Sequence, residues 1–323
     1  MTVRIAFVGA GGIASNHFGN LEQIPEAAVV AAYDADPARV AAACRRFPSC
    51  AGYESFKKML DSAHFDALYV CVPPFAHGEY EVEAARRGIH LLVEKPVGVD
   101  LARAREVQHA IDSAGILNSV GYHWRYLDTT ALAAQALAGK PVGLVLGYWI
   151  GAMPQVSWWR VRAQSGGQAV EQTTHIFDLM RYLVGEVESV YAVGSSGLMS
   201  NWPNYDVDDA SVVTMRLRNG ATASITSADI APRGTGTVGL QVYSRDLIVA
   251  VMNTGLKVST PYHTEETLPA VNPYLLEDRA FVAAVASGDA SGIKSTYADA
   301  VRTLEVTLAA SESMASGRVV PIG

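Results

Sequence analysis

The stretch Gly9-Ala10-Gly11-Gly12-Ile13-Ala14 follows an apolar run of strand length at Arg4–Gly9 and opens a helix-like segment. It fits the pattern G-x-G-x-x-A, in which the first glycine permits a tight turn, the second lets the backbone approach a pyrophosphate, and Ala14 permits close packing of helix on strand. The helix N-terminus offers free N–H groups to phosphates. Asp34 ends the next apolar run, about 20 residues further on, where a carboxylate accepts hydrogen bonds from ribose hydroxyls. Together these features predict a dinucleotide site.

The first 122 residues alternate between strand-like and helix-like patterns. Strands that alternate with helices form βαβ units around a parallel sheet with both faces covered. We therefore predict an α/β fold that begins with a doubly wound parallel sheet. The expected strands are Arg4–Gly9, Ala28–Asp34, Asp66–Pro73, His90–Glu94 and Leu117–Tyr122, and the expected helices include Pro37–Phe47, His77–Gly88 and Leu101–Ala114.

After Tyr122 several strands follow one another without helices between them, which indicates an antiparallel sheet. Arg218-Asn219-Gly220 joins two of these strands, and Asn-Gly is a strong hairpin signal because both central residues need a positive φ. The change of pattern divides the chain into domains 1–122 and 123–323. The expected strands are Gly143–Ile150, Ser189–Gly194, Ala210–Leu217, Ala221–Ala228 and Val238–Val251, and the expected helices are Arg125–Ala138, Gln168–Val184 and two more after Asn272.

The composition excludes several classes of protein. Half of the 323 residues are hydrophobic and 18% are charged without long blocks, which is enough for packed cores and unlike a disordered chain. The net charge of −7 argues against a nucleic-acid or anionic-membrane surface. Cys44, Cys50 and Cys71 form no C-x-x-C pair, which argues against a disulfide framework or cysteine-rich zinc site and favours the cytoplasm. The uncharged segment Pro141–Trp159 contains two prolines and three glycines, so we expect no membrane span.

Glu94-Lys95-Pro96 closes the strand predicted at His90–Glu94. A lysine at the carboxyl end of a parallel strand projects its ammonium group into the crevice where a nicotinamide would lie, and there it can polarise a carbonyl or stabilise an alkoxide. The alternative is an ordinary surface Glu–Lys pair, worth under about 1 kcal/mol.

Pro73-Pro74, with His77 three residues later, ends the strand predicted at Asp66–Pro73. Ligands of doubly wound sheets lie at the carboxyl ends of the strands, so these residues are candidates for cofactor binding. The alternative is a proline-stiffened turn with no ligand.

Glu171, His175, Asp178 and Arg181 share one face of the helix predicted at Gln168–Val184. A carboxylate one turn from an imidazole can orient the ring and stabilise its protonated form, as a general base requires. One alternative is a helix face tied together by salt bridges. Another is a metal site, which we do not favour because no second set of ligands with suitable spacing occurs elsewhere.

Two short segments combine aromatic and basic side chains. Trp159 lies in the run Ser157–Arg162, and His123, Arg125 and Tyr126 follow the last predicted strand of the first domain. Aromatic faces with fixed hydrogen-bond donors suit sugar rings, but they also suit an interdomain core, and the sequence does not separate the two.

Taken together, these motifs resemble the Gfo/Idh/MocA oxidoreductases. The similarity rests on the glycine pattern, on Pro-Pro with His77, on Glu94-Lys95-Pro96, and on Gly166-Gly167 followed by Glu171 and His175, and it extends over essentially the whole chain. It implies an N-terminal Rossmann domain and a C-terminal α/β domain with a large open, mostly antiparallel sheet, with a C-terminal helix that can pack back on the first domain.

The resemblance also implies NAD(P)-dependent chemistry on a secondary alcohol or ketone of a sugar or inositol-like ring. Lys95 matches the family's catalytic lysine and His175 its proton-transferring histidine, whereas Glu171 occupies a position where related dehydrogenases commonly have Asp, which leaves its role open. Alternatives on the same fold are a nucleotide- or sugar-sensing regulator and an NAD-assisted glycosidase. The candidate substrate-binding residues are His123, Arg125, Tyr126, Trp159, Gln172 and His175.

We expect NAD rather than NADP as the cofactor, because Asp34 would repel a 2′-phosphate and no basic residue follows it directly. Arg39 is the one nearby cation that could reach such a phosphate. We also expect a homodimer or homotetramer formed through the C-terminal sheet, and no metal. The residues expected to bind the cofactor are Gly9, Gly11, Gly12, Ile13, Ala14, Asp34, Arg39, Pro73, Pro74, His77, Glu94 and Lys95.

Overall fold

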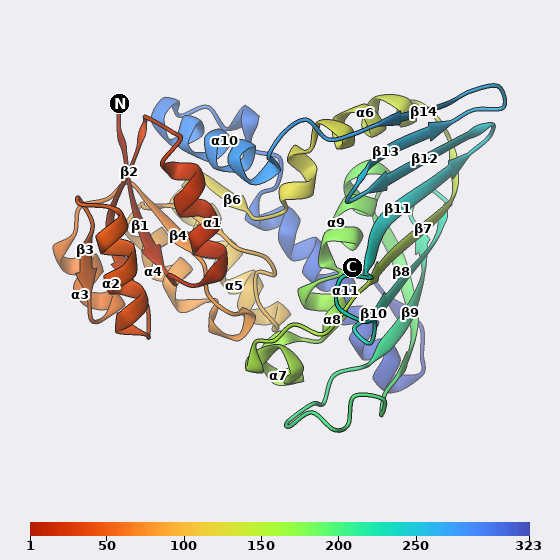
Figure 1. The fold of residues 1–323 in the computed structure, drawn as a ribbon, viewed down its shortest axis with the longest axis horizontal. Helices are drawn as coiled ribbons and strands as arrows, with labels where there is room; N and C mark the ends of the chain where they lie inside the picture. Colours follow the sequence, from red (N-terminus) through yellow and green to blue (C-terminus); the bar gives the residue numbers. More distant parts are fainter. The chain divides into compact units, whose positions relative to one another are not determined.

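A computed structural model describes residues 1–323. The chain forms two compact units (Figure 1). The first unit contains residues 1–126 and 272–301, and the second contains residues 127–271 and 302–323. The units differ from the predicted domains 1–122 and 123–323 mainly because residues 272–301 belong to the first unit.

The first unit is built on a six-stranded sheet with the strand order β3-β2-β1-β4-β5-β6. Every pair of neighbouring strands is parallel, as predicted. The strand order runs outward from β1 in both directions, which places connecting helices on both faces of the sheet. The strands are β1 (Val3–Val8), β2 (Ala27–Tyr33), β3 (Ala51–Tyr53), β4 (Ala67–Val70), β5 (His90–Val93) and β6 (Asn118–Val120).

A helix from the last quarter of the chain completes the core of this unit. Phe281 and Val282 belong to the same buried cluster as Phe7 and Phe18. Figure 1 shows the corresponding helix, α10 in blue, beside α1 in red. The helices of this unit are α1 (Gly12–Leu21), α2 (Pro37–Arg46), α3 (Phe56–Ser62), α4 (Glu79–Arg86), α5 (Leu101–Ala114) and α10 (Pro273–Ser287), together with the 3₁₀ turns η1 (Pro74–Ala76), η2 (His123–Tyr126) and η4 (Ala290–Gly292).

Side-chain caps fix the starts of several of these helices. Asp36 accepts a hydrogen bond from the main-chain N–H of Ala38 at 2.9 Å, and Pro37 occupies the first helical position of α2. Asp100 caps α5 in the same way, and Gly115 ends that helix with a φ of 63°. Because these signals flank α2 and α5, both helices were predicted correctly. The elements β3 and α3 were not predicted, because they are too short for a clear periodicity.

The second unit contains a nine-stranded sheet with the order β14-β13-β12-β11-β7-β10-β9-β8-β15. Its neighbouring strands are antiparallel except for β7 and β10, which run parallel. The predicted large, mostly antiparallel sheet is therefore confirmed. The strands are β7 (Val142–Ile150), β8 (Val187–Ser195), β9 (Ala210–Leu217), β10 (Thr222–Ala228), β11 (Thr237–Ser244), β12 (Leu247–Met252), β13 (Gly255–Ser259), β14 (Thr264–Thr267) and β15 (Val320–Pro321).

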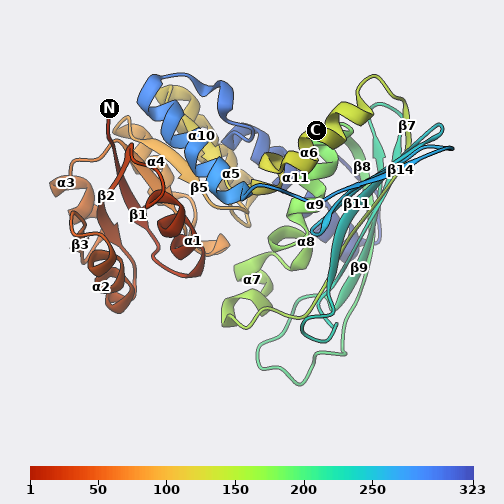
Figure 2. The ribbon, with the colours of Figure 1, turned by 45° about the horizontal axis from the view of Figure 1, so that its top comes forward.

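Helices cover one face of this sheet and leave the other uncovered, as Figure 2 shows. In β9 the burial alternates, with Val213 and Met215 buried and Val212 exposed. This alternation is expected for a sheet with one face on the core. The helices of this unit are α6 (Asp128–Leu137), α7 (Arg162–Ser165), α8 (Gln168–Glu171), α9 (Thr174–Leu183), the 3₁₀ turn η3 (Ser157–Arg160) and most of α11 (Tyr297–Ser316), which begins in the first unit.

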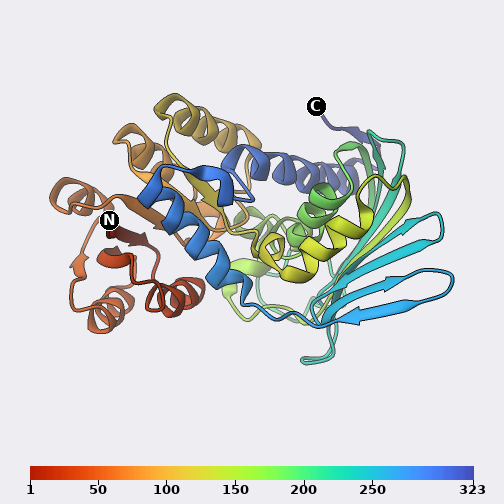
Figure 3. The ribbon, with the colours of Figure 1, turned by 90° about the horizontal axis from the view of Figure 1, so that it is seen from above.

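Two strand predictions for this unit need correction. The run Val238–Val251 is not one strand but the hairpin of β11 and β12, which turns at Asp246 with a φ of 58° (Figure 3). The turn has no glycine or proline, so no strong signal interrupts the apolar run. The hairpin at Asn219-Gly220 is present, but only Gly220 has a positive φ (89°), and the N–H of Leu217 bonds to the carbonyl of Ala221 across a three-residue loop.

Two helix predictions were also too long. The region Arg125–Ala138 is divided between η2 and α6, and Gln168–Val184 is divided between α8 and α9. At the second break the N–H of Thr173 bonds to the carbonyl of Gln168 at 2.9 Å, a wider turn than in an α-helix, and the Thr173 hydroxyl pairs with Ser227. Glu171 and His175 therefore belong to successive helices, and their predicted placement on one face of a single helix is wrong.

None of the helices combines the length and the apolar character that crossing a lipid bilayer requires.

Candidate active site

The glycine stretch forms a close turn between β1 and α1. Gly9 has a φ of 84°, and a Cβ atom there would lie 2.2 Å from the carbonyl oxygen of Cys71, so the turn requires glycine. At Gly12, in contrast, an added Cβ would meet no atom within 4 Å. Gly12 is the first residue of α1, whose first N–H groups have no partner within the helix. The backbone thus leaves open space at a helix N-terminus, which fits a phosphate group.

Asp34 lies beside this turn, at the carboxyl end of β2. One carboxylate oxygen accepts the N–H of Ala10 at 2.7 Å, and the other accepts the N–H of Asp36 at 2.8 Å. Arg39 extends over both acids, with its Nη1 3.8 Å from Asp34 and its Nε 3.5 Å from Asp36. The acid is therefore held in a fixed orientation next to the glycine turn, and the predicted cation lies close to it.

The loop after β4 carries the second group of predicted cofactor residues. Pro73 precedes η1, which begins at Pro74, and His77 follows it. The Nδ1 atom of His77 pairs with a carboxylate oxygen of Glu81 at 2.6 Å, whereas Nε2 is buried without a hydrogen-bond partner. A buried polar atom without a partner is unusual in a folded protein. Together with the space at Gly12, it indicates that these residues fit a polar ligand such as a dinucleotide.

Glu94 and Lys95 follow β5 on the same edge of the parallel sheet. Glu94 is only 4% exposed, so these two residues are not an ordinary surface pair. One oxygen of Glu94 pairs with Nε2 of His17 at 3.2 Å, and the other accepts the main-chain N–H of Lys95 at 3.0 Å. The Lys95–Pro96 peptide bond is cis. The main chain at Lys95 is thus anchored from inside the unit, while its side chain remains partly exposed.

The residues of η2 contact the C-terminal part of the first unit. His123 stacks on Tyr274 with 3.9 Å between ring centroids, and burial, with the charge of Lys95, lowers the pKa of His123 to about 3. His123 is therefore neutral at physiological pH. The hydroxyl of Tyr126 accepts the N–H of Lys294 at 2.9 Å. Both aromatic residues are largely enclosed, and substrate contact by either of them stays a prediction.

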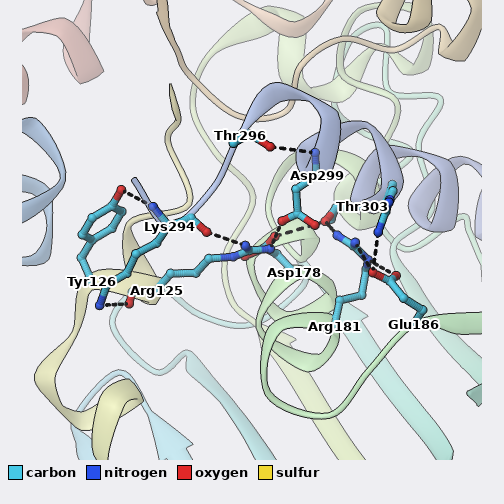
Figure 4. A network of polar contacts seen from close by, with 10 residues as sticks. Arg125, Tyr126, Asp178, Arg181, Glu186, Lys294, Thr296, Asp299 and Thr303 are labelled. Carbon is cyan, nitrogen blue, oxygen red and sulfur yellow. Dashed lines mark hydrogen bonds and ion pairs between the residues drawn. The ribbon is translucent and has the colours of Figure 1, made fainter. Parts of the chain in front are cut away.

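Arg125 is buried in a polar network, part of which is drawn in Figure 4. Its guanidinium pairs with Asp299 at 2.5 Å and donates to the carbonyl of Lys294 at 2.7 Å. Both partners belong to the C-terminal part of the first unit. These contacts give Arg125 a structural role there, and direct binding of substrate stays a prediction.

The second unit supplies the other predicted catalytic residues. Glu171, at the end of α8, accepts a hydrogen bond from the indole N–H of the fully buried Trp159 at 2.9 Å. His175, in the first turn of α9, is 5% exposed and stacks against Trp149, with 5.8 Å between ring centroids and 19° between planes. Gln172 lies between the two helices and is partly exposed. Trp159 therefore limits the motion of the Glu171 carboxylate, and Trp149 limits the motion of the His175 imidazole.

Asp178 and Arg181 make hydrogen bonds within the second unit, also seen in Figure 4. Arg181 donates two hydrogen bonds to Glu186, each at 2.8 Å, and one to the hydroxyl of Thr303 at 2.6 Å. That hydroxyl donates in turn to Asp178 at 3.1 Å. These contacts join α9 to Glu186 and to Thr303 of α11.

Sequence reasoning missed two buried residues next to the predicted site, His17 and Asp278. His17 lies on the apolar face of α1 with Ala14 and Phe18. A histidine in such a stripe was the available signal, although a core histidine without a function gives the same pattern. Nothing in the sequence connects it with Asp278, 261 residues away. No group of three or more His, Cys, Asp or Glu side chains is arranged to hold a metal ion.

The parallel sheet, the glycine turn and the acid at the end of β2 define the class of the first unit, a dinucleotide-binding Rossmann domain. Residues 3–122 match the family model described as "Oxidoreductase family, NAD-binding Rossmann fold", and residues 126–246 match the model of the GFO/IDH/MocA C-terminal domain. The chain therefore belongs to the GFO/IDH/MocA family, which confirms the resemblance seen in the sequence.

Individual relatives agree with this assignment. The chain is 27% identical over 237 residues to myo-inositol 2-dehydrogenase of Thermotoga maritima, covering 72% of this chain and 70% of the relative. It is 26% identical over 340 residues to inositol 2-dehydrogenase of Rhizobium meliloti, covering 100% of both chains. The solved structure of levoglucosan dehydrogenase in complex with NADH shares the fold, with a TM-score of 0.89, 20% identity and 100% coverage of both chains.

The contact between Trp159 and Glu171 generates a testable prediction. Trp159→Phe retains an aromatic ring but removes the only N–H of the indole, so the Glu171 carboxylate loses a donor inside the fold. We expect the free energy of unfolding to fall by about 1.5–3 kcal/mol, the contribution of a hydrogen bond to a charged group. Urea denaturation followed by circular dichroism measures this change.

Trp158→Phe is the matched control, because Trp158 is partly buried in the same aromatic cluster and its indole does not contact Glu171. It should cost clearly less than Trp159→Phe. Equal losses for the two variants would mean that ring packing, and not the hydrogen bond to Glu171, accounts for the effect.

Proposed function

We propose that this protein transfers a hydride between NAD and a ring secondary alcohol or ketone of a sugar or inositol-like polyol. The observation that carries the proposal is the anchored Lys95 at the carboxyl edge of the parallel sheet, beside a glycine turn that fits a dinucleotide. The relatives named as inositol dehydrogenases support this substrate class.

In this proposal Lys95 stabilises the oxygen of the substrate hydroxyl group that is oxidised. When bound, NAD supplies the hydride acceptor, and its reduced form supplies the hydride donor. The ammonium group of Lys95 holds the substrate hydroxyl and stabilises the negative charge that develops on its oxygen during oxidation. Because Glu94 fixes the main chain at Lys95, the side chain starts from a rigid point.

His175 exchanges the proton of the same hydroxyl group. During oxidation the neutral imidazole accepts this proton, and during reduction the imidazolium returns it. Stacking on Trp149 restricts the plane of the ring. Glu171, fixed by Trp159, either orients the imidazole or binds a substrate hydroxyl. Trp159, Gln172, His123, Arg125 and Tyr126 remain the candidates for contacts with the rest of the sugar ring.

The proposal predicts separate effects for the two catalytic side chains. With myo-inositol as the first substrate to be tried, followed by other polyols, formation of NADH is measured by its absorbance. Lys95→Ala should lower kcat by about 10²–10³ and leave NAD affinity within a few-fold. His175→Ala should lower kcat by about 10²–10⁴. Near-normal kcat in both variants would contradict the proposal, and turnover without stoichiometric NADH would favour a glycosidase.

The position of Asp34 predicts the choice of cofactor. Its carboxylate lies at the end of β2, where it accepts the ribose 2′-hydroxyl of NAD and repels the 2′-phosphate of NADP. We expect kcat/KM to favour NAD at least tenfold, or about 1.4 kcal/mol. Arg39→Ala should leave this preference unchanged or increase it, because Arg39 is the cation nearest to Asp34. Equal or better turnover with NADP would overturn the assignment.

We also propose that the uncovered face of the large sheet binds a second copy of this chain. By strand register, Leu146 on β7, Val212 on β9 and Val193 on β8 share this face. Each of these three side chains is 37–51% exposed. Exposed apolar side chains that share one face mark a candidate interaction surface, and a two-fold axis lets one face pack against itself. Further exposed members of this face are Leu144, Tyr191 and Ile248.

Light scattering tests this assembly. The wild type should have at least twice the 34.4 kDa mass of one chain at micromolar concentration. Val212→Lys places a charge on this face, directly beside Val193, and should shift the protein toward monomer, because a desolvated unpaired charge is costly. Leu268→Lys, at an exposed apolar residue that follows β14 and lies outside the strands of the sheet, is the control and should not change the mass. A monomeric wild type would exclude the proposal.

A further inference from the structure

His17 is enclosed completely within the first unit, between two carboxylates. Its side chain has no exposed surface, and neither does that of Asp278, while Glu94 is about 5% exposed. Nδ1 of His17 lies 2.8 Å from Asp278, and Nε2 lies 3.2 Å from Glu94. The three residues come from α1, from the end of β5 and from α10, so the contacts join three separate parts of the chain.

The contacts of the ring favour its protonated form. Between two ionised carboxylates, which only accept hydrogen bonds, an imidazole donates from both nitrogens and is then a cation. Burial alone lowers the pKa of His17, but the charge and hydrogen bond of Asp278, together with those of Glu94, raise it well above its ordinary value. The imidazolium in turn compensates two carboxylates that burial would otherwise strongly destabilise.

Other titratable groups around the ring do not compete for this role. Tyr69 of β4 contacts the ring edge-on, with 5.3 Å between centroids, and burial and Asp278 raise the pKa of its hydroxyl, which stays neutral. His123 of η2 is neutral, because its pKa is lowered to about 3. Lys95 is the other cation near this cluster, and its charge contributes to the low pKa of His123.

Glu94 connects His17 with the main chain at Lys95. One of its oxygens faces His17, and the other accepts the N–H of Lys95 at 3.0 Å. A Cβ atom at Gly121 would lie 2.8 Å from the Glu94 carboxyl group, so the carboxylate fills its site and has little freedom to turn. We propose that His17 is a positioning residue: its imidazolium orients Glu94, which in turn fixes the main chain from which the Lys95 side chain extends.

This inference rests on the proposed function only for its consequence in catalysis. The orientation of Glu94 and Lys95 is a property of the protein alone and is measured without substrate. Asn20 provides a matched control, since it lies on the same helix and donates to the other oxygen of Asp278 at 2.8 Å, with no hydrogen bond to Glu94.

The first experiment is nitrogen NMR of the wild type with ¹⁵N-labelled histidine. Both ring nitrogens of His17 should carry protons at pH 7 and remain protonated at about pH 8, whereas an ordinary histidine is then neutral. Glu94→Gln and Asp278→Asn should each lower the pKa of His17, which also assigns its signals. A neutral His17 ring at pH 7 would overturn the inference.

The second experiment measures hydrogen exchange at the main-chain N–H of Lys95. His17→Gln removes the positive charge, and the amide of glutamine cannot replace both hydrogen bonds that the imidazolium donates to Asp278 and Glu94. Hydrogen exchange at the main-chain N–H of Lys95 should therefore accelerate by about tenfold or more. Asn20→Ala should leave that rate within about twofold, even where its overall stability falls. Equal acceleration in both variants would reduce His17 to a structural residue. If His17→Gln does not fold, Glu94→Gln, which weakens the same link, gives the same readout.

Kinetics with myo-inositol, or the polyol that the substrate screen identifies, separates this inference from the proposed function. His17→Gln should lower kcat by about tenfold with little change in KM, and by no more than about twofold in the Lys95→Ala background, because the two residues act in one chain of contacts. A full tenfold loss in that background would contradict positioning through Lys95. Near-normal kcat for Lys95→Ala would contradict the proposed function, while the NMR and exchange results would still decide the role of His17.

Discussion

All six strands of the first sheet run in the same direction, so their carboxyl ends lie along one edge. This single constraint brings together residues that are far apart in the sequence. Gly9, Asp34, Pro73 and Lys95 each follow a different strand and therefore face the same edge. Helices begin at this edge as well, and their N-terminal N–H groups add positive potential. The parallel direction of the strands is therefore enough to place the candidate cofactor-binding residues and Lys95 at one edge of the sheet, whatever side-chain contacts they make.

Much of this arrangement could be predicted, because its signals are local. A glycine turn, an acid after the second strand and Asp or Ser caps each involve a few neighbouring residues, and their physical requirements are specific. The failures occurred where local signals were absent or misleading. The turn at Asp246 has no glycine or proline, so the hairpin of β11 and β12 resembled one long strand. The break at Thr173 is stabilised by Ser227 on β10, a contact that no local pattern reveals.

The residues of the candidate site also fall into two groups, those that the sequence predicted and those that it did not. Lys95 and His175 could be identified from short motifs, but the residues that hold the site in place could not. Trp159 restrains Glu171 across a bend, and His17 meets Asp278 from the opposite end of the sequence. Such partners are determined by packing, which brings an ordinary buried side chain against a reactive one. In both units a buried polar or aromatic group from another element limits the motion of a residue that the sequence motif already suggested.

The contribution of α10 to the first unit has a consequence for how the protein is made. Translation delivers residues 1–126 first, but residues 272–301, which complete the same unit, leave the ribosome only after residues 127–271. During that interval the face of α1 that will contact Phe281 and Val282 is exposed to solvent, and His17 has only one of its two carboxylate partners. Because domains usually fold as units, the Rossmann domain of this chain reaches its final packing only near the end of synthesis. The nascent chain therefore carries an exposed apolar surface while residues 127–271 are synthesised, and chaperones can bind to such a surface.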